Sequence, residues 1–459
     1  MKTFSYGDDT PIAAFATTPG KSALTLIRCS GKGSLELAAK TFSIPEKITL
    51  AAGNTVVHGW IVTPNERIDD VLVSVFHAPK SYTGEDSLDI SCHGGNAACQ
   101  AVMAALRAVG FRDALPGEFT FRAFMNGKLD LTRAESVMEL VSARTDRARG
   151  KAINRLSGVL EKEIGAIKKT LVEVLSGAEI FLDYSDDEIS ADAEEIAGRL
   201  PGEKPAREAF ARLQKLAQSW QLERIYQEGI LAVIAGRPNS GKSSLFNLLL
   251  KEERSIVTDV PGTTRDWIEA WVSIEGIPVR LTDTAGLRDS SDQVERIGVE
   301  RSRDLLEAAD IVLYLIDGES GITDEDTALI DGLAVSPLVI WNKTDIAPAP
   351  KELIAISAKT GEGVAELATA IATTIQTAIA ANAGNSDMSP SLGTIRQKNL
   401  VEAAIAALQE ALNLAEKNEP LDLISPMLRE AVNSLGEITG EVSTADILEE
   451  MFSKFCVGK

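Results

Sequence analysis

A glycine-rich run in the middle of the chain has the residue types and spacing of a phosphate-binding loop. Gly236-Arg-Pro-Asn-Ser-Gly-Lys-Ser243 fits the pattern G-x-x-x-x-G-K-[ST]. The glycines let the backbone turn tightly, so that loop N–H groups and the following helix N-terminus point at phosphate oxygens. We expect Lys242 to neutralise the β- and γ-phosphates and the Ser243 hydroxyl to hold Mg²⁺. The alternative is an ordinary glycine-rich turn between a strand and a helix.

The flanking segments supply the setting that a phosphate loop requires. Residues 230–235 form a short apolar run typical of a buried strand, and residues 244–250 are typical of a helix. A strand, a glycine loop and a helix in that order favour nucleotide binding over an ordinary turn.

Two further segments are placed to sense the end of the nucleotide. Residues 255–265 form a polar loop whose Thr264 is expected to bind Mg²⁺ and the γ-phosphate when the loop closes. Residues 270–274 and 279–282 predict a hairpin around Glu275-Gly276, which leads into Asp283-Thr-Ala-Gly286. Asp283 is expected to contact Mg²⁺ indirectly, and the Gly286 N–H to meet the γ-phosphate.

A later motif selects the base. Asn342-Lys-Thr-Asp345 follows an apolar strand, at the strand end where an open α/β sheet binds ligands. Guanine offers two adjacent N–H donors that Asp345 can accept, whereas adenine would leave this carboxylate unsatisfied. Asn342 and Lys343 would brace the loop and the ring, and Ser357-Ala-Lys359 would supply a backbone contact to the guanine oxygen. Together these motifs are typical of the translation-factor-type GTPases.

One position departs from the Ras-like pattern. Leu287 follows Gly286 where Ras-like proteins carry a water-orienting glutamine, and leucine cannot orient water. Hydrolysis therefore needs another group to position water and another positive charge. Glu295 is a candidate for the first role, although it also fits a solvated surface acid. A monovalent cation with Asn239 as one oxygen ligand is a candidate for the second.

Composition narrows the class of protein. A chain of 459 residues predicts about two to four domains. The net charge of −21 and the lack of a basic stripe disfavour a protein that holds nucleic acid alone. With 4 cysteines in no C-x-x-C pair and 3 histidines, the chain predicts no zinc framework and reduced, cytoplasmic thiols. The sequence contains no apolar stretch long enough to predict a membrane span.

The remaining patterns predict a division of the chain into four segments. Residues 1–127 are mixed and β-rich, with strands near residues 23–28, 55–62, 71–76 and 88–92 and a helix over 97–109 that ends at Gly110. Residues 128–223 are helical and begin with a capping box, Thr132-Arg-Ala-Glu135. The acidic stretch 183–195 and the run 200–205 indicate either a bend between helices or a solvated face.

The second half suggests an insertion. Residues 224–381 alternate strands and helices, and 382–391 have the composition of a linker. The tail, residues 382–459, is helical from about residue 395, and we expect breaks at Pro420 and Pro426. Helical segments on both sides of an α/β unit predict one helical domain into which that unit is inserted.

The whole chain resembles the MnmE (TrmE) family of tRNA-modification GTPases. Beyond the nucleotide motifs, the residues that carry the resemblance are Tyr82-Thr-Gly-Glu-Asp86, His93-Gly-Gly95, Pro116-Gly-Glu-Phe119, Arg122-Ala-Phe, Asn126-Gly-Lys-Leu-Asp-Leu131, Asp283-Thr-Ala-Gly-Leu-Arg288 and the terminal Phe455-Cys-Val-Gly-Lys459. The resemblance runs from end to end, and its terminal motif is highly specific.

The resemblance implies an architecture and an activity. The fold class is an α/β G domain, a P-loop NTPase with a mixed sheet, inserted into an α-helical domain and preceded by an N-terminal α+β domain. That first domain would bind a tetrahydrofolate derivative (5,10-methylene- or 5-formyl-tetrahydrofolate) and form the homodimer. The G domain would hydrolyse GTP with Mg²⁺ and K⁺. With the FAD-containing partner MnmG (GidA), which is expected to hold most of the tRNA, the product is an aminomethyl or carboxymethylaminomethyl group at C5 of wobble uridine.

The family's functional residues carry over by position. The implied K⁺ ligands are Asn239, Thr258, Val260 and Thr263, and the implied Mg²⁺ ligands are Ser243 and Thr264. The implied nucleotide contacts are Asn239, Ser240, Gly241, Lys242, Ser243, Ser244, Thr258, Asp259, Val260, Pro261, Gly262, Thr263, Thr264, Asp283, Thr284, Ala285, Gly286, Asn342, Lys343, Asp345, Ser357 and Ala358. The implied folate contacts are Arg28, Asp89, Lys128 and Lys459, and the catalytic candidates are Glu295, Lys242 and Cys456.

Three positions leave alternatives open. Asp89 stands where the family often has Glu, so the carboxylate is kept but shortened by one methylene. Cys456 is either a reactive thiol or a small buried hydrophobe. His93-Gly-Gly95 invites comparison with an esterase oxyanion loop, but the sequence has no G-x-S-x-G, which favours a turn near the folate site.

Two other functions compete with the implied one. A regulatory or ribosome-assembly GTPase would act by binding alone, and a basic RNA-binding appendage would favour it. A folate-dependent methyl carrier would use its G domain only for regulation, and loss of folate turnover without GTP would favour it.

Overall fold

The structure, a computed structural model, describes residues 6–18, 20–183, 200, 202–252, 269–283, 305–333, 335–380 and 389–458. Contacts between residues divide the chain into two compact units. The first comprises residues 1–138, 156–206 and 406–459, and the second comprises residues 139–155 and 207–405. The division into four segments stays a prediction. Among the described residues, no helix is long and apolar enough to cross a membrane.

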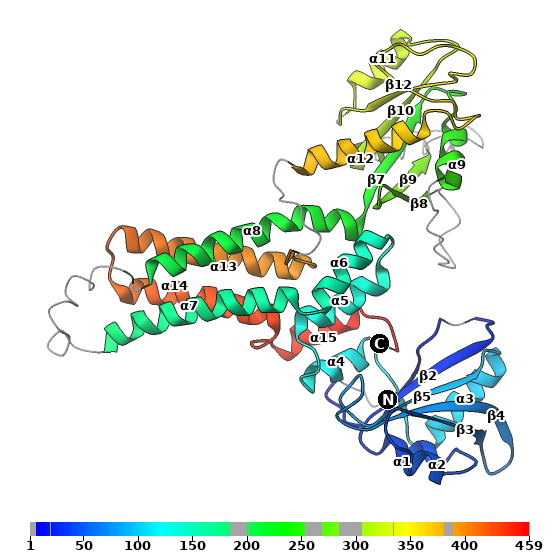
Figure 1. The fold of residues 1–459 in the computed structure, drawn as a ribbon, viewed down its shortest axis with the longest axis vertical. Coiled ribbons are helices and arrows are strands. Elements are labelled where there is room, and N and C mark those ends of the chain that lie inside the picture. Colours follow the sequence, from blue (N-terminus) through cyan, green and yellow to red (C-terminus); the bar gives the residue numbers. More distant parts are fainter. Residues whose placement is uncertain are drawn as a thin grey trace, which may run out of the picture. The chain divides into compact units, whose positions relative to one another are not determined.

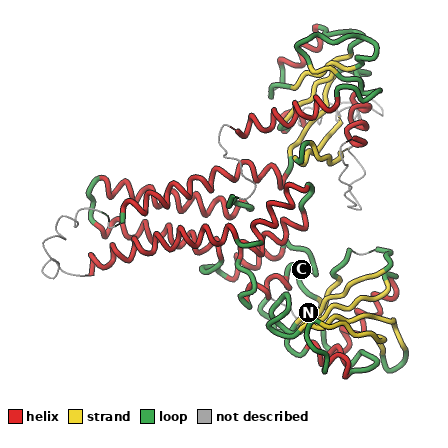
Figure 2. Tube along the Cα trace, in the orientation of Figure 1, coloured by secondary structure: helices red, strands yellow, loops and turns green. Residues whose placement is uncertain are grey.

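The first unit is built on a six-stranded sheet with the order β3-β4-β5-β2-β1-β6 (Figures 1 and 2). Its strands are mainly antiparallel, with β1 and β6 parallel. The strands are β1 (Ile12–Phe15), β2 (Leu24–Ser30), β3 (Thr55–Val62), β4 (Arg67–Phe76), β5 (Ser87–His93) and β6 (Arg112–Asp113). Each predicted strand is present, within a few residues of its expected ends.

One face of this sheet packs on helices and the other carries exposed apolar side chains. Alternate residues of the strands, including Ile27, Val73 and Ile90, form a core with α1 (Ser34–Ala39), α2 (Glu46–Thr49) and α3 (Asn96–Val109). The helix predicted before Gly110 is thus confirmed. The opposite face carries Leu24, Val56, Trp60 and Leu72, whose exposed fractions are 62%, 62%, 37% and 49%.

Five further helices lie wholly or partly in the described part of the first unit. They are α4 (Glu118–Met125), α5 (Leu131–Ser142, whose last residues belong to the second unit), α7 (Val159–Asp183), α14 (Leu421–Thr439) and α15 (Ala445–Ser453). The capping box predicted at Thr132 is wrong. Asp130 caps α5, because its Oδ1 accepts the N–H groups of Thr132 at 2.8 Å and Arg133 at 3.2 Å. Thr132 therefore lies inside the helix.

The prolines of the tail differ in their effect. Pro420 is the N-cap of α14, as a break predicts, but Pro426 lies inside the same helix. The missing N–H of Pro426 removes one bond near the beginning of the helix, to the carbonyl of Asp422. Packing of α14 on α7, with Leu428 and Leu435 fully buried, keeps the helix continuous (Figure 1). The break predicted at Pro426 is therefore wrong.

The second unit contains a six-stranded mixed sheet with the order β12-β11-β10-β7-β9-β8, in which only β8 runs antiparallel to its neighbour. Its strands are β7 (Ile230–Gly236), β8 (Glu269–Ile274), β9 (Ile277–Asp283), β10 (Ile311–Asp317), β11 (Leu338–Asn342) and β12 (Ile354–Ala355). Buried side chains lie on both faces of this sheet. Its helices are α9 (Lys242–Glu252), α11 (Asp324–Asp331) and α12 (Val364–Ala380). This sheet confirms the α/β fold class. The predicted hairpin is also present, and its turn consists of Glu275 and Gly276, which both have positive φ.

Three more helices belong wholly or partly to this unit: α6 (Asp146–Leu156), α8 (Glu203–Glu228) and α13 (Ile395–Glu416). The bend expected through residue 205 is wrong at its end, because α8 begins at Glu203. Pro205 fits the first helical turn, where its missing N–H has no helical partner to lose. The acidic stretch lies outside the described residues beyond Asp183.

A buried ion cluster connects the helices of this unit to residues 391–393, which lie between α12 and α13 in the sequence. Arg155 is 2% exposed and donates to Glu139 at 2.7 Å, to Glu223 at 2.8 Å and to Ser391 Oγ at 3.0 Å. Burial alone would lower the pKa of Arg155, but the two carboxylates raise it above its ordinary value. Gly393 passes so close that a Cβ would lie 2.1 Å from Glu139 Oε1. The cluster therefore fixes the position of the segment that leads into α13.

Candidate functional site

The phosphate loop adopts the backbone that its glycines predict. Gly236 and Gly241 have φ values of 139° and 99°, and Asn239 between them has a φ of 65°. A Cβ at Gly241 would lie 2.1 Å from Asn342 Nδ2, so the loop needs glycine there for space as well as for conformation. The loop joins β7 to α9, and the strand–loop–helix prediction is confirmed.

The Lys242 side chain curls over the loop. Its Nζ donates to the carbonyl oxygens of Gly236 at 2.9 Å and Arg237 at 2.7 Å, and the residue is 7% exposed. The two carbonyl partners are neutral, and they hold the Lys242 ammonium at the surface of the loop. The arrangement can therefore receive an anion at the loop.

A hydroxyl and a carboxylate meet beside the loop. Ser243, in the first turn of α9, donates from Oγ to Asp283 Oδ2 at 2.7 Å, and Asp283 ends β9. Strands β7 and β9 are parallel neighbours, so their carboxyl ends bring these two residues together. Two hard oxygen donors next to a phosphate loop fit Mg²⁺.

The base-selecting residues form a second hydrogen-bonded group. Asn342 Nδ2 donates to the Ser240 carbonyl at 2.7 Å, and its Oδ1 accepts the Ala358 N–H at 2.9 Å. Ser357 Oγ donates to Asp345 Oδ1 at 2.7 Å. Asn342 thus links the phosphate loop to the loop after β12. Ser357 orients the Asp345 carboxylate, and this geometry can present an acceptor to paired N–H donors.

Sequence reasoning missed two acidic partners of Lys343. Its Nζ donates to Asp317 Oδ2 at 2.7 Å and to Glu319 at 3.4 Å. The Asp317 hydrogen bond is the main reason that the pKa of Lys343 is raised. Asp317 ends β10, the strand between β7 and β11. The rule that ligands gather at carboxyl ends of parallel strands could have identified it.

A separate group of charged residues lies in the first unit. Arg28 on β2 and Asp89 on β5 are directly opposed in the sheet and form an ion pair at 3.0 Å. The Arg28 guanidinium lies 5.6 Å from the centre of the Tyr82 ring. Lys128 Nζ donates to the Pro79 carbonyl at 2.9 Å, on the loop that leads to Tyr82. The predicted folate contacts thus include one adjoining pair, with Lys128 bound to a neighbouring loop.

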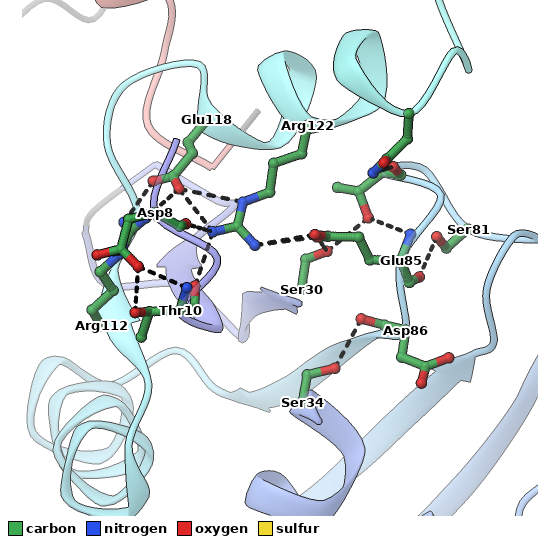
Figure 3. A network of polar contacts seen from close by, with 12 residues as sticks. Asp8, Thr10, Ser30, Ser34, Ser81, Glu85, Asp86, Arg112, Glu118 and Arg122 are labelled. Atoms are coloured by element: carbon green, nitrogen blue, oxygen red, sulfur yellow. Dashed lines mark hydrogen bonds and ion pairs between the residues drawn. The ribbon is translucent and has the colours of Figure 1, made fainter. Parts of the chain in front are cut away.

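Figure 3 shows the polar network that holds this loop. Glu118 is fully buried and accepts from Arg112 at 2.7 Å and from Arg122 at 3.0 Å. Arg122 also donates to Glu85 at 3.2 Å, and Glu85 accepts from Ser30 at 2.8 Å. Because Ser30 ends β2, the network joins the motif around Glu118 to the loop beside Arg28.

The C-terminal motif packs against the Gly117 turn and the end of β1. The Gly117 N–H donates to the Cys456 carbonyl at 3.2 Å, and a Cβ at Gly458 would lie 2.4 Å from the Phe15 carbonyl oxygen. Cys456 is exposed, so the reading of it as a buried hydrophobe is wrong. The His93-Gly-Gly95 turn joins β5 to α3, and Asp69 accepts from His93 Nδ1 at 2.6 Å when that nitrogen carries the proton.

Several predicted residues lie outside the described ones. They are Thr258, Asp259, Val260, Pro261, Gly262, Thr263, Thr264, Thr284, Ala285, Gly286, Glu295 and Lys459. Their roles stay predictions. Ser244 lies in the first turns of α9, as the motif requires.

Comparison with known proteins gives matches over nearly the whole chain. A family model described as MnmE helical domain matches residues 131–456, and one described as GTP-binding protein TrmE N-terminus matches residues 11–128. The protein named tRNA modification GTPase MnmE from Treponema denticola is 42% identical over 99% of both chains. The protein of the same name from Alkaliphilus oremlandii is 37% identical over 99% of this chain and 100% of its own. The one from Streptococcus thermophilus is 39% identical over 98% of both chains.

Among solved structures, the G domain of the T. maritima FeoB iron transporter aligns with 33% of this chain and 98% of its own. The identity is 24% and the TM-score is 0.24, too low to support an inference.

Proposed function

This chain belongs to the MnmE family of tRNA modification GTPases, and we propose that it is a K⁺-dependent GTPase that modifies wobble uridine. It acts with the FAD-containing partner MnmG and a tetrahydrofolate one-carbon donor, and it installs an aminomethyl or carboxymethylaminomethyl group at C5. The observation that carries the proposal is that one chain holds both the phosphate loop with Asp345 and the Arg28–Asp89 pair. The direct test is whether these uridines disappear from tRNA in cells that lack this protein.

We propose a role for each described residue of the nucleotide site. Lys242 would neutralise the β- and γ-phosphates, and Ser243 and Asp283, which are 2.7 Å apart, would hold Mg²⁺, Ser243 directly and Asp283 indirectly. Asp345 accepts two N–H groups of guanine in the orientation that Ser357 sets. Asn342 fixes the distance between phosphate loop and base loop through its bonds to Ser240 and Ala358.

Hydrolysis in this protein requires charge and water positioning without a glutamine. Leu287 stands at the glutamine position, so we assign water positioning to Glu295. Asn239, Thr258, Val260 and Thr263 would hold K⁺ through their oxygen atoms, and the bound cation would supply positive charge near the phosphates. Asn239 lies at the tight turn of the phosphate loop, where its backbone has a positive φ of 65°.

Replacing K⁺ by Na⁺ at constant ionic strength is expected to slow GTP hydrolysis by roughly a thousandfold. A cation that takes the place of an arginine finger stabilises the transition state, where such a charge is worth at least about 10³. The measurement is phosphate release at saturating GTP and Mg²⁺ in each salt, with GDP affinity as the control for intact binding. Equal rates in the two salts would refute the K⁺ assignment.

The folate assignment rests on the charged pair of the first unit. The Arg28 guanidinium and Asp89 carboxylate, beside the Tyr82 ring, combine ionic and stacking partners for a flat, heteroaromatic and anionic molecule. Lys128 and Lys459 contribute further positive charge. Bound tetrahydrofolate supplies the one-carbon unit. Asp89 keeps the carboxylate of the family position and is held within 3.0 Å of Arg28 despite its shorter side chain. Cys456 is exposed and stands as the candidate thiol for this chemistry.

We assign the homodimer contact to the exposed apolar face of the first sheet. Leu24, Val56, Trp60 and Leu72 lie on the face opposite the helices. Four large apolar side chains on one face of the sheet favour association over solvent exposure. A second copy of the same sheet presents the matching apolar surface, as a two-fold interface requires.

A variant with both Leu24→Glu and Leu72→Glu is expected to weaken dimerisation by at least a factor of about a hundred. Burying two leucines contributes about 3 kcal/mol or more, and buried carboxylates would add a desolvation cost. Sedimentation velocity over a concentration series measures the change. The matched control is Leu50→Glu, at a leucine that is 79% exposed and follows α2. A double variant that remains as dimeric as the Leu50→Glu control would contradict the assignment.

The charge of the chain is consistent with a divided task. A net charge of −21 opposes binding of tRNA phosphates by this chain alone. We therefore propose that MnmG holds most of the tRNA, while this chain supplies GTP hydrolysis and the one-carbon unit. Because its proposed substrate is tRNA, we propose that the protein acts in the cytoplasm, where its free cysteines would stay reduced.

A further inference from the structure

An ion pair joins the phosphate loop to the segment that follows β10. Arg237 comes directly after Gly236, and its Nε lies 3.0 Å from the Asp326 carboxylate. Its terminal nitrogen donates to Ser320 Oγ at 2.8 Å and to the Gly321 carbonyl at 3.2 Å. The Arg237 side chain is 19% exposed and that of Asp326 is 0% exposed. A charged pair with so little water around it is more firmly held than a surface pair.

Asp326 is itself fixed from other directions. Its Oδ2 accepts the N–H of Thr323 at 3.0 Å and the Thr323 hydroxyl at 2.8 Å, in the capping box that begins α11. Its Oδ1 accepts the hydroxyl of Tyr314, a buried residue of β10, at 3.1 Å. Burial alone would raise the pKa of Asp326, but these hydrogen bonds and that of Arg237 lower it. The carboxylate is therefore an ionised, immobile partner for Arg237 at neutral pH.

The main chain of Arg237 reaches the phosphate-binding lysine. Its carbonyl oxygen accepts from Lys242 Nζ at 2.7 Å, and the neighbouring Gly236 carbonyl accepts at 2.9 Å. We infer that Asp326 is a positioning residue for the phosphate loop. It holds Arg237, and through Arg237 the first turn of the loop, in the conformation that presents Lys242 to the nucleotide. This inference rests on the proposed nucleotide site.

The inference separates phosphate binding from base selection. Guanine is read by Asp345, which Ser357 orients in a different hydrogen-bonded group. Loss of the Arg237–Asp326 pair should therefore lower the affinity for every nucleoside diphosphate by the same factor. The preference for GDP over inosine diphosphate, which lacks the guanine amino group, should stay unchanged.

The experiment is calorimetric titration of the full chain with GDP and with inosine diphosphate in Mg²⁺. Asp326→Asn removes the charge that faces Arg237 and keeps the size of the side chain. We expect it to lower the affinity for both nucleotides about tenfold, the cost of one charge-assisted hydrogen bond. Arg237→Gln tests the same contact from its more exposed side and serves where Asp326→Asn fails to fold. The double variant should lose no more affinity than the single variant that binds more weakly, because both substitutions remove the same contact.

Two controls bracket the result. Tyr314→Phe removes a different donor to Asp326 and should bind both nucleotides within about twofold of the wild type, because the ion pair stays intact. Asp345→Asn should change the ratio of the two affinities. If the wild type binds no GDP, the proposed nucleotide site itself is wrong. If the wild type binds GDP, and Asp326→Asn and Arg237→Gln each bind it as tightly as the wild type does, the inference is overturned. Additive losses in the double variant, or a changed GDP preference, would also overturn it.

Discussion

Lys242→Ala is expected to abolish GTP binding at micromolar nucleotide. The Lys242 ammonium is 7% exposed and sits over the loop on the carbonyl oxygens of Gly236 and Arg237. Its removal takes away the fixed positive charge that compensates the β- and γ-phosphates. Truncating one side of a buried charged contact costs about 4 kcal/mol, or roughly a thousandfold in affinity.

Fluorescence titration with a labelled GTP analogue measures this loss. The matched control is Lys251→Ala, because Lys251 is an exposed lysine at the other end of the same helix, α9. That control loses a positive charge without touching the loop and should bind as the wild type does. Undiminished affinity in Lys242→Ala, at unchanged thermal stability, would refute the phosphate-site assignment.

Asp345→Asn is expected to exchange the preferred base. In the wild type, Ser357 Oγ donates to Asp345 Oδ1 at 2.7 Å. The asparagine keeps this Oδ1 acceptor but replaces the second oxygen with an NH₂ donor. Two charge-assisted bonds to guanine are lost, at about 2 kcal/mol each, so GTP affinity should fall by roughly a thousandfold. Xanthine carries a carbonyl in place of the guanine amino group, and the new donor can bind it.

Competition between GTP and XTP measures the exchange. The variant should hydrolyse XTP at a rate close to that of the wild type with GTP, because the phosphate site is unaltered. Asp331→Asn, at an exposed position near the end of α11, is the control for the loss of one negative charge. A variant that still prefers GTP would place the base elsewhere.

The elements around the nucleotide were predictable because their signals are local. The phosphate loop, the hairpin at Glu275 and Gly276, and the loop of Asn342 each follow an apolar strand and carry residues of restricted chemistry. The parallel pairing of β7 with β9 and β10 then brings their ends together without further information. Strands β2 to β5 of the first sheet were also predictable, since apolar and polar residues alternate along much of their length, whereas the short β1 and β6 were missed.

What could not be predicted depends on packing between distant segments. Asp130 rather than Thr132 caps α5, and both residue types are good caps, so local sequence could not choose between them. Pro426 reads as a helix breaker, but the buried face of α14 against α7 outweighs the single lost bond. The pair of Arg237 and Asp326 joins residues far apart in the sequence, and neither residue type signals the other.

The central claim is that GTP binding by this chain drives uridine modification in tRNA. Mass spectrometry of tRNA nucleosides tests it in cells that lack this protein and are complemented with the wild type or with Lys242→Ala. We predict that C5-aminomethyl-type uridines are absent without the protein, return with the wild type and stay absent with Lys242→Ala. Lys251→Ala should restore them and so controls for expression. Unchanged nucleosides in the cells that lack the protein would contradict the claim, and the nucleotide site would then serve another client.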